Sequence, residues 1–256
     1  MKVVILTGGL GTRLQEYTTI IPKPMVEIGG KPILWHIMKS YDFYGFQEFV
    51  LAMGYKSEVI KDYFYNYYYR INNMSINLKE GTTDFHDNQS ENWLVHLLDT
   101  GLLTQTGGRV KRSAEFIGDE TFMLTYGDGV SNVNIRDLLN FHKKEGKIAT
   151  VTAVRPPARF GGLTFEGNRV VRFQEKPQLG EGWINGGYFV LEPEIKEYIR
   201  NNETIFEKEP LERLAEEGEL VAYRHDNFWQ CMDTIRDVHV LNSMWEQNKS
   251  PWKVWE

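Results

Sequence analysis

Apolar and polar residues alternate along this chain with two different periods. Short apolar runs rich in β-branched residues, the first at 3–6 and the second at 48–53, predict buried strands. Between them apolar residues recur at helical spacing, which predicts a helix that begins at Pro32 and ends at Gly45. The same analysis predicts further strands at 74–78, 93–97, 122–126, 149–154 and 184–191, and further helices at 59–67, 110–115, 135–142, from 193, 211–217 and 235–245.

Strands that alternate with helices predict an α/β fold of the Rossmann-like kind, with a mixed but mostly parallel sheet flanked by helices. Two stretches interrupt the alternation. Residues 79–92 are polar and show no period, so we predict a long loop there. Two short apolar runs within 160–173 predict a small β-hairpin inserted at the edge of the sheet. We expect residues 1–256 to form a single domain.

The composition narrows the class of protein. A net charge of −6 argues against general nucleic-acid binding, which needs a clustered basic face. Cys231 is the only cysteine, which excludes an internal disulfide and fits a reducing compartment. No apolar run approaches the roughly 18 residues of a membrane span, and the run at 3–6 ends too early for a signal peptide. We therefore predict a cytoplasmic protein whose partners include neither nucleic acid nor a membrane.

A glycine-rich loop, Thr-Gly-Gly-Leu-Gly-Thr-Arg (7–13), directly follows the first predicted strand. Backbone amides exposed at the carboxyl end of a parallel strand suit a pyrophosphate or triphosphate. Arg13 adds a permanent charge whose fork geometry matches phosphate oxygens. The spacing fits neither the dinucleotide fingerprint nor the P-loop. From the glycines alone, a plain turn between strand and helix explains the loop equally well.

Four other segments carry candidate chemistry, each with a structural alternative. Lys23 lies between two prolines, which present it in an extended segment. Asp128 ends an apolar strand between two glycines, where it suits a magnesium ion or a tight turn. Residues 104–109 open a helix and offer either free amides to an anion or a glycine-rich cap. Asp233 precedes the last helix and could be its N-cap.

Together these motifs resemble a known family. Gly-Gly-Leu-Gly-Thr-Arg-Leu (8–14) followed by Pro-Lys-Pro-Met (22–25) is similar to the signature of the sugar-1-phosphate nucleotidylyltransferases. Continuing through residues 26–38, the chain looks most like the subgroup of glucose-1-phosphate cytidylyltransferases. The spacing from Trp229 to Asp233, longer than the Trp-x-Asp of many relatives, also fits the cytidylyl subgroup. The resemblance runs from Val3 through the tail.

The resemblance implies that CTP and glucose 1-phosphate give CDP-glucose and pyrophosphate, by in-line attack on the α-phosphorus with Mg²⁺ as cofactor. It assigns catalysis to Arg13, Lys23 and Asp128, with Asp128 and Asp233 as metal ligands. The nucleotide-binding residues are then Leu6, Thr7, Gly8, Gly9, Leu10, Gly11, Thr12, Arg13, Lys23, Thr104, Thr106, Gly107, Arg109 and Gly127. The sugar-phosphate-binding residues are Gly161, Glu175, Lys176, Asn185 and Gly186.

On this basis the domain divides into three parts. About residues 1–154 bind the nucleotide, about 155–233 bind the sugar phosphate, and 234–256 form a C-terminal helix and tail. The tail at 251–256 is rich in tryptophan, so we expect it to pack against a neighbouring subunit of a homo-oligomer. Three alternatives stay open: thymidylyl or uridylyl transfer to the same sugar phosphate, a non-catalytic protein that senses nucleotide sugars, and a nicotinamide-dependent oxidoreductase.

Overall fold

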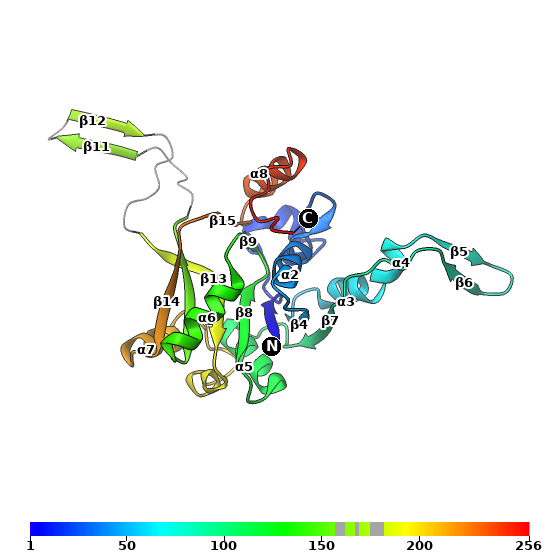
Figure 1. Cartoon of the computed structure of the whole chain (residues 1–256), viewed down its shortest axis with the longest axis horizontal. Helices are drawn as coiled ribbons and strands as arrows, with labels where there is room; N and C mark the ends of the chain where they lie inside the picture. The colour runs from blue at the N-terminus through cyan, green and yellow to red at the C-terminus, as the bar shows by residue number, and fades with distance from the viewer. Residues whose placement is uncertain (157–161, 167–168, 175–181, 256) are drawn as a thin grey trace.

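A seven-stranded sheet organises the protein, as the computed structural model of residues 1–156, 162–166, 169–174 and 182–255 shows (Figure 1). The strand order is β14-β10-β13-β8-β1-β4-β7. The strands are β1 (Val3–Leu6), β4 (Glu48–Met53), β7 (Leu94–Asp99), β8 (Phe122–Tyr126), β10 (Ala149–Val154), β13 (Ile184–Leu191) and β14 (Leu220–His225). The prediction of strands at 3–6, 48–53, 122–126, 149–154 and 184–191 is confirmed.

One strand runs against the others. β13 is antiparallel to both of its neighbours, β8 and β10, whereas the remaining pairs in the sheet are parallel. Leu6, the last residue of β1, lies beside Tyr126 of β8 and Ala52 of β4. The carboxyl ends of these parallel strands therefore meet at one edge of the sheet, where open α/β folds bind their ligands. The predicted mixed, mostly parallel sheet is confirmed.

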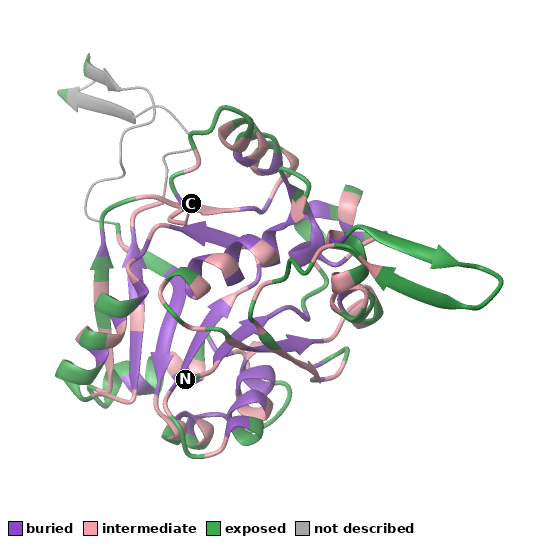
Figure 2. Ribbon diagram, turned by 45° about the vertical axis from the view of Figure 1, so that its right-hand side comes forward, coloured by how far each residue is buried: buried purple, intermediate pink, exposed green. Residues whose placement is uncertain are grey.

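Helices cover both faces of the sheet. One buried cluster contains the apolar side of α2 (Ile33–Phe43), and the other contains Val110, Ala114 and Ile117 of α5 (Thr106–Ile117). Figure 2 shows the central strands as the most buried layer. The other helices are α1 (Gln15–Thr18), α3 (Ser57–Tyr65), α4 (Tyr67–Ile71), α6 (Ile135–Glu145), α7 (Glu209–Glu216) and α8 (Ile235–Glu246), with short 3₁₀ turns η1 (Thr12–Leu14), η2 (Lys23–Met25) and η3 (Pro193–Tyr198). In the described parts of the chain, no helix is both long and apolar enough to cross a bilayer.

Three helix predictions need correction. Pro32 does not begin the helix, because it pairs with Glu27 in the small sheet of β2 (Glu27–Ile28) and β3 (Lys31–Pro32). The predicted helix at 59–67 is broken at Asn66, whose side chain donates hydrogen bonds to the carbonyl and carboxylate of Asp62. The segment from Pro193 is a 3₁₀ turn.

The polar stretch 79–92 is not the loop that we predicted. It contributes β6 (Thr82–Phe85), which pairs with β5 (Met74–Asn77) in a hairpin whose turn includes Gly81, at φ 68°. This hairpin projects from the body (Figure 1), and nearly all of its residues are exposed. A strand exposed on both faces has no alternation of apolar and polar residues, so its sequence pattern resembles a loop.

The second predicted hairpin is present, but its place differs from the prediction. β11 (Gly162–Glu166) and β12 (Arg169–Gln174) form a separate two-stranded sheet and do not extend the edge of the main one. They enter the chain between β10 and β13, which are interior neighbours in the sheet. Gly161, Glu175 and Lys176, predicted to bind the sugar phosphate, lie outside the described residues.

Trp252 of the C-terminal tail packs on its own chain, so the predicted contact with a neighbouring subunit is wrong for this residue. Trp252 is only 1% exposed. Its ring stacks on Phe228 and Trp245, and its indole N–H points at His36 Nδ1 over 3.4 Å. The sequence could not show this, because apolar tail residues fit either surface equally well.

We predict that Trp252→Ala lowers the free energy of unfolding by about 3–5 kcal/mol, the usual cost of truncating a buried aromatic side chain. Urea denaturation followed by circular dichroism measures the loss, with the half-buried Trp255→Ala as a milder control. The difference from the wild type should be equal at two protein concentrations tenfold apart. A difference that grows on dilution would mean that another subunit covers the tail.

Candidate active site

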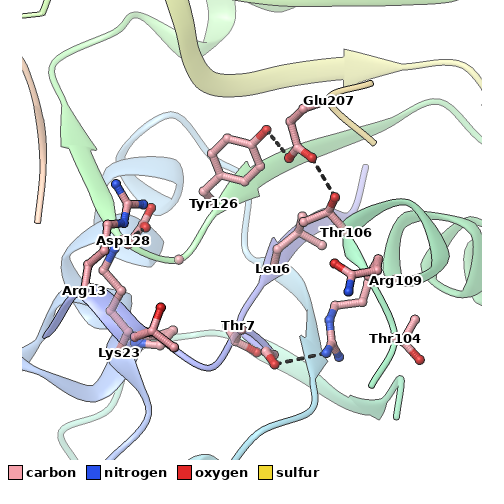
Figure 3. A pocket seen from close by; sticks show the side chains of 17 residues that line it. Leu6, Thr7, Arg13, Lys23, Thr104, Thr106, Arg109, Tyr126, Asp128 and Glu207 are labelled. Atoms are coloured by element: carbon pink, nitrogen blue, oxygen red, sulfur yellow. Dashed lines mark hydrogen bonds and ion pairs between the residues drawn. The ribbon is translucent and has the colours of Figure 1, made fainter. Parts of the chain in front are cut away.

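A cavity of about 400 Å³ opens at the carboxyl ends of β1 and β8 (Figure 3). Most of the residues predicted to bind a nucleotide line it, namely Leu6, Thr7, Gly8, Gly9, Gly11, Thr12, Arg13, Lys23, Thr104, Thr106, Arg109 and Gly127. Leu10 and Gly107 belong to the same loops but do not line the cavity. Four further lining residues were absent from the prediction, and they are Pro24, Gln105, Tyr126 and Glu207.

Lys23 forms the charged centre of this site. Only 8% of the residue is exposed, and its Nζ donates to Asp128 Oδ2 at 2.6 Å and to Asp233 Oδ1 at 2.5 Å. Asp233 Oδ2 also accepts from Arg13 at 2.5 Å. Pro22 and Pro24 fix the backbone around the lysine, since each restricts its own φ. The alternative of a solvated loop lysine is therefore excluded.

The charges of this cluster reinforce one another. Burial by itself lowers the pKa of Lys23, but the neighbouring Asp128 and Asp233 carboxylates outweigh it and raise the pKa above the ordinary value. For Asp233 burial alone would raise the pKa, because it disfavours the charged carboxylate. The cations of Lys23 and Arg13 outweigh burial and bring this pKa below its ordinary value. Lys23 and Asp233 are consequently both ionised at neutral pH.

The two carboxylates fit a divalent cation. Asp128 and Asp233 can bring their oxygens, together with the thiol of Cys231, within 4.8 Å of one another. The Lys23 ammonium already bridges these carboxylates as a cation would. Asp233 is not the N-cap of α8, because Thr234 fills that role in a capping box with Asp237. Its carboxylate is therefore available to the site, and hard divalent cations prefer such oxygen ligands.

Arg109 is buried at the other end of the cavity. Its guanidinium donates to the carbonyls of Met53 at 2.8 Å and Gly8 at 3.0 Å, and to Thr100 Oγ1 at 2.6 Å. The carbonyl of Leu102 also accepts from this guanidinium at 3.3 Å, so four protein acceptors hold the arginine in place. A Cβ at Gly8 would lie 2.2 Å from the guanidinium, and one at Gly54 would lie 2.4 Å from it. Both glycines are thus required for this position of the arginine.

The predicted sugar residues that the structure describes lie on β13. Asn185 Nδ2 donates to the hydroxyl of Tyr126 at 3.1 Å, which brings it next to the cavity. Gly186 contacts protein instead of open space, because Trp229 donates to its carbonyl at 2.7 Å and a Cβ would meet Val154 at 2.6 Å. The glycine therefore allows close packing at this point of the strand.

Comparison with known proteins identifies the family. The family model described as nucleotidyl transferase matches residues 2–250. The chain belongs to this family. It is 51% identical to the glucose-1-phosphate cytidylyltransferase of Salmonella typhi and 47% identical to the probable glucose-1-phosphate cytidylyltransferase of Bacillus subtilis, in each case over 100% of both chains. The predicted family is confirmed.

Solved structures of lower identity share the fold. HddC from Yersinia pseudotuberculosis superposes with a TM-score of 0.68 at 24% identity, covering 95% of this chain and 99% of that one. A UDP-glucose pyrophosphorylase superposes with a TM-score of 0.67 at 17% identity, covering 97% of this chain and 98% of that one. Nucleotidyl transferases in general use a divalent metal, which agrees with the carboxylate pair of this site.

We predict that Asp128→Asn leaves the fold intact and weakens both metal binding and nucleotidyl transfer. Asparagine suits the turn between Gly127 and Gly129, and Lys23 keeps Asp233 as a partner, so the free energy of unfolding should change by less than about 1 kcal/mol. Loss of one well-placed charge should lower kcat/KM by at least about 10².

Turnover at saturating divalent metal, metal titration and the melting temperature of the apoprotein check this on one preparation. Asp119→Asn is the matched control, because that side chain is 94% exposed and does not line the cavity. An active Asp128→Asn variant, or one that unfolds without ligand, would show that Asp128 is only a turn residue.

Proposed function

We propose that this chain is a glucose-1-phosphate cytidylyltransferase that makes CDP-glucose and pyrophosphate from CTP and glucose 1-phosphate. The observation that carries the proposal is the 51% identity to the Salmonella typhi cytidylyltransferase over the whole of both chains. A sensor and an oxidoreductase receive less support. A sensor without catalysis has no need of the Arg13, Lys23 and Asp128 cluster, and an oxidoreductase would need a dinucleotide fingerprint that the loop at 7–13 lacks.

The described residues support a mechanism of positioning and charge neutralisation. A sugar-phosphate oxygen attacks the α-phosphorus of CTP in line, the new P–O bond forms, and pyrophosphate leaves with the electrons of the broken bond. The amides of the loop at 7–12 hold the triphosphate, and Arg13 neutralises the leaving pyrophosphate. Lys23 neutralises the α-phosphate. Cys231 is not a nucleophile, because burial raises the pKa of its thiol and the adjacent carboxylate of Asp128 raises it further.

Asp128 and Asp233 would hold a magnesium ion, which supplies charge neutralisation between the reacting phosphates when bound. Two carboxylates and no histidine suit Mg²⁺, which keeps several waters and commonly binds one or two carboxylates plus substrate phosphates. The Lys23 ammonium donates to both of these carboxylates and so holds them side by side.

In this proposal, each substrate is bound by a different part of the chain. Residues up to about 154 supply the loop, Lys23 and Arg109 to the nucleotide, and residues of about 155–233 serve the sugar phosphate. Asn185 supports this division, since it reaches the cavity through Tyr126. Glu175 and Lys176 are assigned to the sugar phosphate by their motif alone.

We predict that CTP is used at least tenfold better than dTTP, UTP, ATP or GTP, as measured by kcat/KM with glucose 1-phosphate and Mg²⁺. This ratio corresponds to about 1.4 kcal/mol between transition states. The prediction rests on the identity of the whole chain to the cytidylyltransferases of Salmonella typhi and Bacillus subtilis. Pyrophosphate release reports all five nucleotides in one assay. A preference for dTTP would contradict the proposal.

We also propose that the protein is a homo-oligomer in which the β5–β6 hairpin contacts a second copy. An isolated two-stranded hairpin is marginally stable in water, yet this one carries exposed Met74 and Ile76 on one face, followed by Leu78 at 90% exposure. The same surface on a second copy is a self-complementary partner for such an apolar row.

Light scattering after size exclusion tests this assembly. Wild-type protein should have a multiple of the 29.9 kDa chain mass, and Ile76→Asp should shift it toward that single mass. Asn77→Asp places the same charge on the opposite face of β5 and should leave the mass unchanged. A monomeric wild type, or an unchanged mass in Ile76→Asp, would argue against the hairpin as the contact.

A further inference from the structure

Glu207 brings a second carboxylate to the cavity, and it lies far along the sequence from the glycine loop, Lys23 and Asp128. Two acidic residues line the cavity within the described part of the chain, Asp128 and Glu207. Asp128 pairs with Lys23 in the charged cluster. Glu207 instead lies on the far side of Tyr126 from that cluster, above the start of α5 (Figure 3). An exposed carboxylate in a cavity for polyanionic substrates requires an explanation.

Two hydroxyl groups hold this carboxylate in place. Tyr126 Oη donates to Glu207 Oε1 at 2.6 Å, and Thr106 Oγ1 donates to Glu207 Oε2 at 2.6 Å. Thr106 Oγ1 in turn accepts from the backbone N–H of Phe206 at 2.9 Å. The hydroxyl proton of Thr106 is thus directed to Glu207. Each carboxylate oxygen keeps a further lone pair for a ligand, because a carboxylate accepts about four hydrogen bonds.

The charge of Glu207 decides what kind of group it can bind. An ionised carboxylate only accepts hydrogen bonds, so its ligand must present a hydroxyl or an amine. Phosphate oxygens at neutral pH would be repelled, and Arg13 and Lys23 already provide for them at the other end of the site. The remaining donors on the proposed substrates are the hydroxyls of the hexose, those of the ribose and the amine of cytosine.

The hydrogen-bond network favours the hexose. Asn185 Nδ2 donates to Tyr126 Oη at 3.1 Å, and the same hydroxyl donates onward to Glu207. Asn185 and Glu207 both come from the part of the chain assigned to the sugar phosphate, and Tyr126 joins them into one polar surface. We infer that Glu207 accepts a hydrogen bond from a hydroxyl group of the hexose and thereby selects the sugar. This inference rests on the proposed function and names a residue that recognises the second substrate, glucose 1-phosphate.

Glu207→Gln is the first test, since it keeps the shape and removes the charge and one acceptor. We expect the KM for glucose 1-phosphate to rise at least about tenfold, the usual loss for a hydrogen bond to a charged group. The KM for CTP should stay within about twofold of the wild type. Glu203→Gln makes the same chemical change at an exposed residue that does not line the cavity, and should change neither KM.

Deoxy sugars identify the contacted group. Glucose 1-phosphates that lack one hydroxyl at a time should include one whose loss lowers kcat/KM in the wild type but lowers it no further in Glu207→Gln. Such non-additivity is the signature of a direct contact, and a residue that acts only on the fold would not produce it. Additive losses for every hydroxyl would overturn the inference.

The remaining outcomes separate this inference from the proposed function. A higher KM for CTP alone would show that Glu207 serves the nucleotide. Equal losses for both substrates with a lower melting temperature would show that it only joins α5 to β8. Either result overturns the inference while the wild type still makes CDP-glucose. If the wild type makes none from CTP and glucose 1-phosphate, the proposed function and this inference fail together.

Discussion

The site depends on one buried cation held between two carboxylates. Asp128 follows Lys23 by 105 residues and Asp233 follows it by 210. The three side chains therefore come from three different segments of the fold. Removing Lys23 would leave both carboxylates without the cation that they share in a partly buried place, which is costly. The sheet order, the proline-flanked turn and the capping box before α8 all serve to bring these three side chains together.

The main sheet could be predicted because its strands are buried. β1 and β4 are almost continuously apolar, which is the pattern of strands covered on both faces. Of the β5–β6 hairpin, the predicted strand at 74–78 is confirmed as β5, but β6 could not be predicted because its four residues carry no apolar period. Trp252 shows a different limit: its burial was evident from the sequence, but its partner was not. Only the fold shows that His36, Phe228 and Trp245 surround it.

Local motifs identified one half of the site. The glycine loop, Lys23 and Asp128 each lie in a short segment whose chemistry can be read directly, and the structure brings them to one cavity. Glu207 lies in the charged stretch at 207–209, where nothing local separates it from a solvated surface. Its position follows from the hydroxyls of Tyr126 and Thr106, which come from other elements. The two glycines that accommodate Arg109 are likewise distant from it in sequence, so only the tertiary structure explains them.

The place of Asp233 and Trp252 near the C-terminus has a consequence for the newly made chain. β1, β4 and β8 emerge early during synthesis, whereas Asp233 is among the last 24 residues of the chain. Lys23 and Asp128 are thus made well before their second acidic partner. The last core tryptophan follows later still. A chain that stops early therefore keeps a nearly complete sheet but carries an unbalanced charge and an open apolar surface.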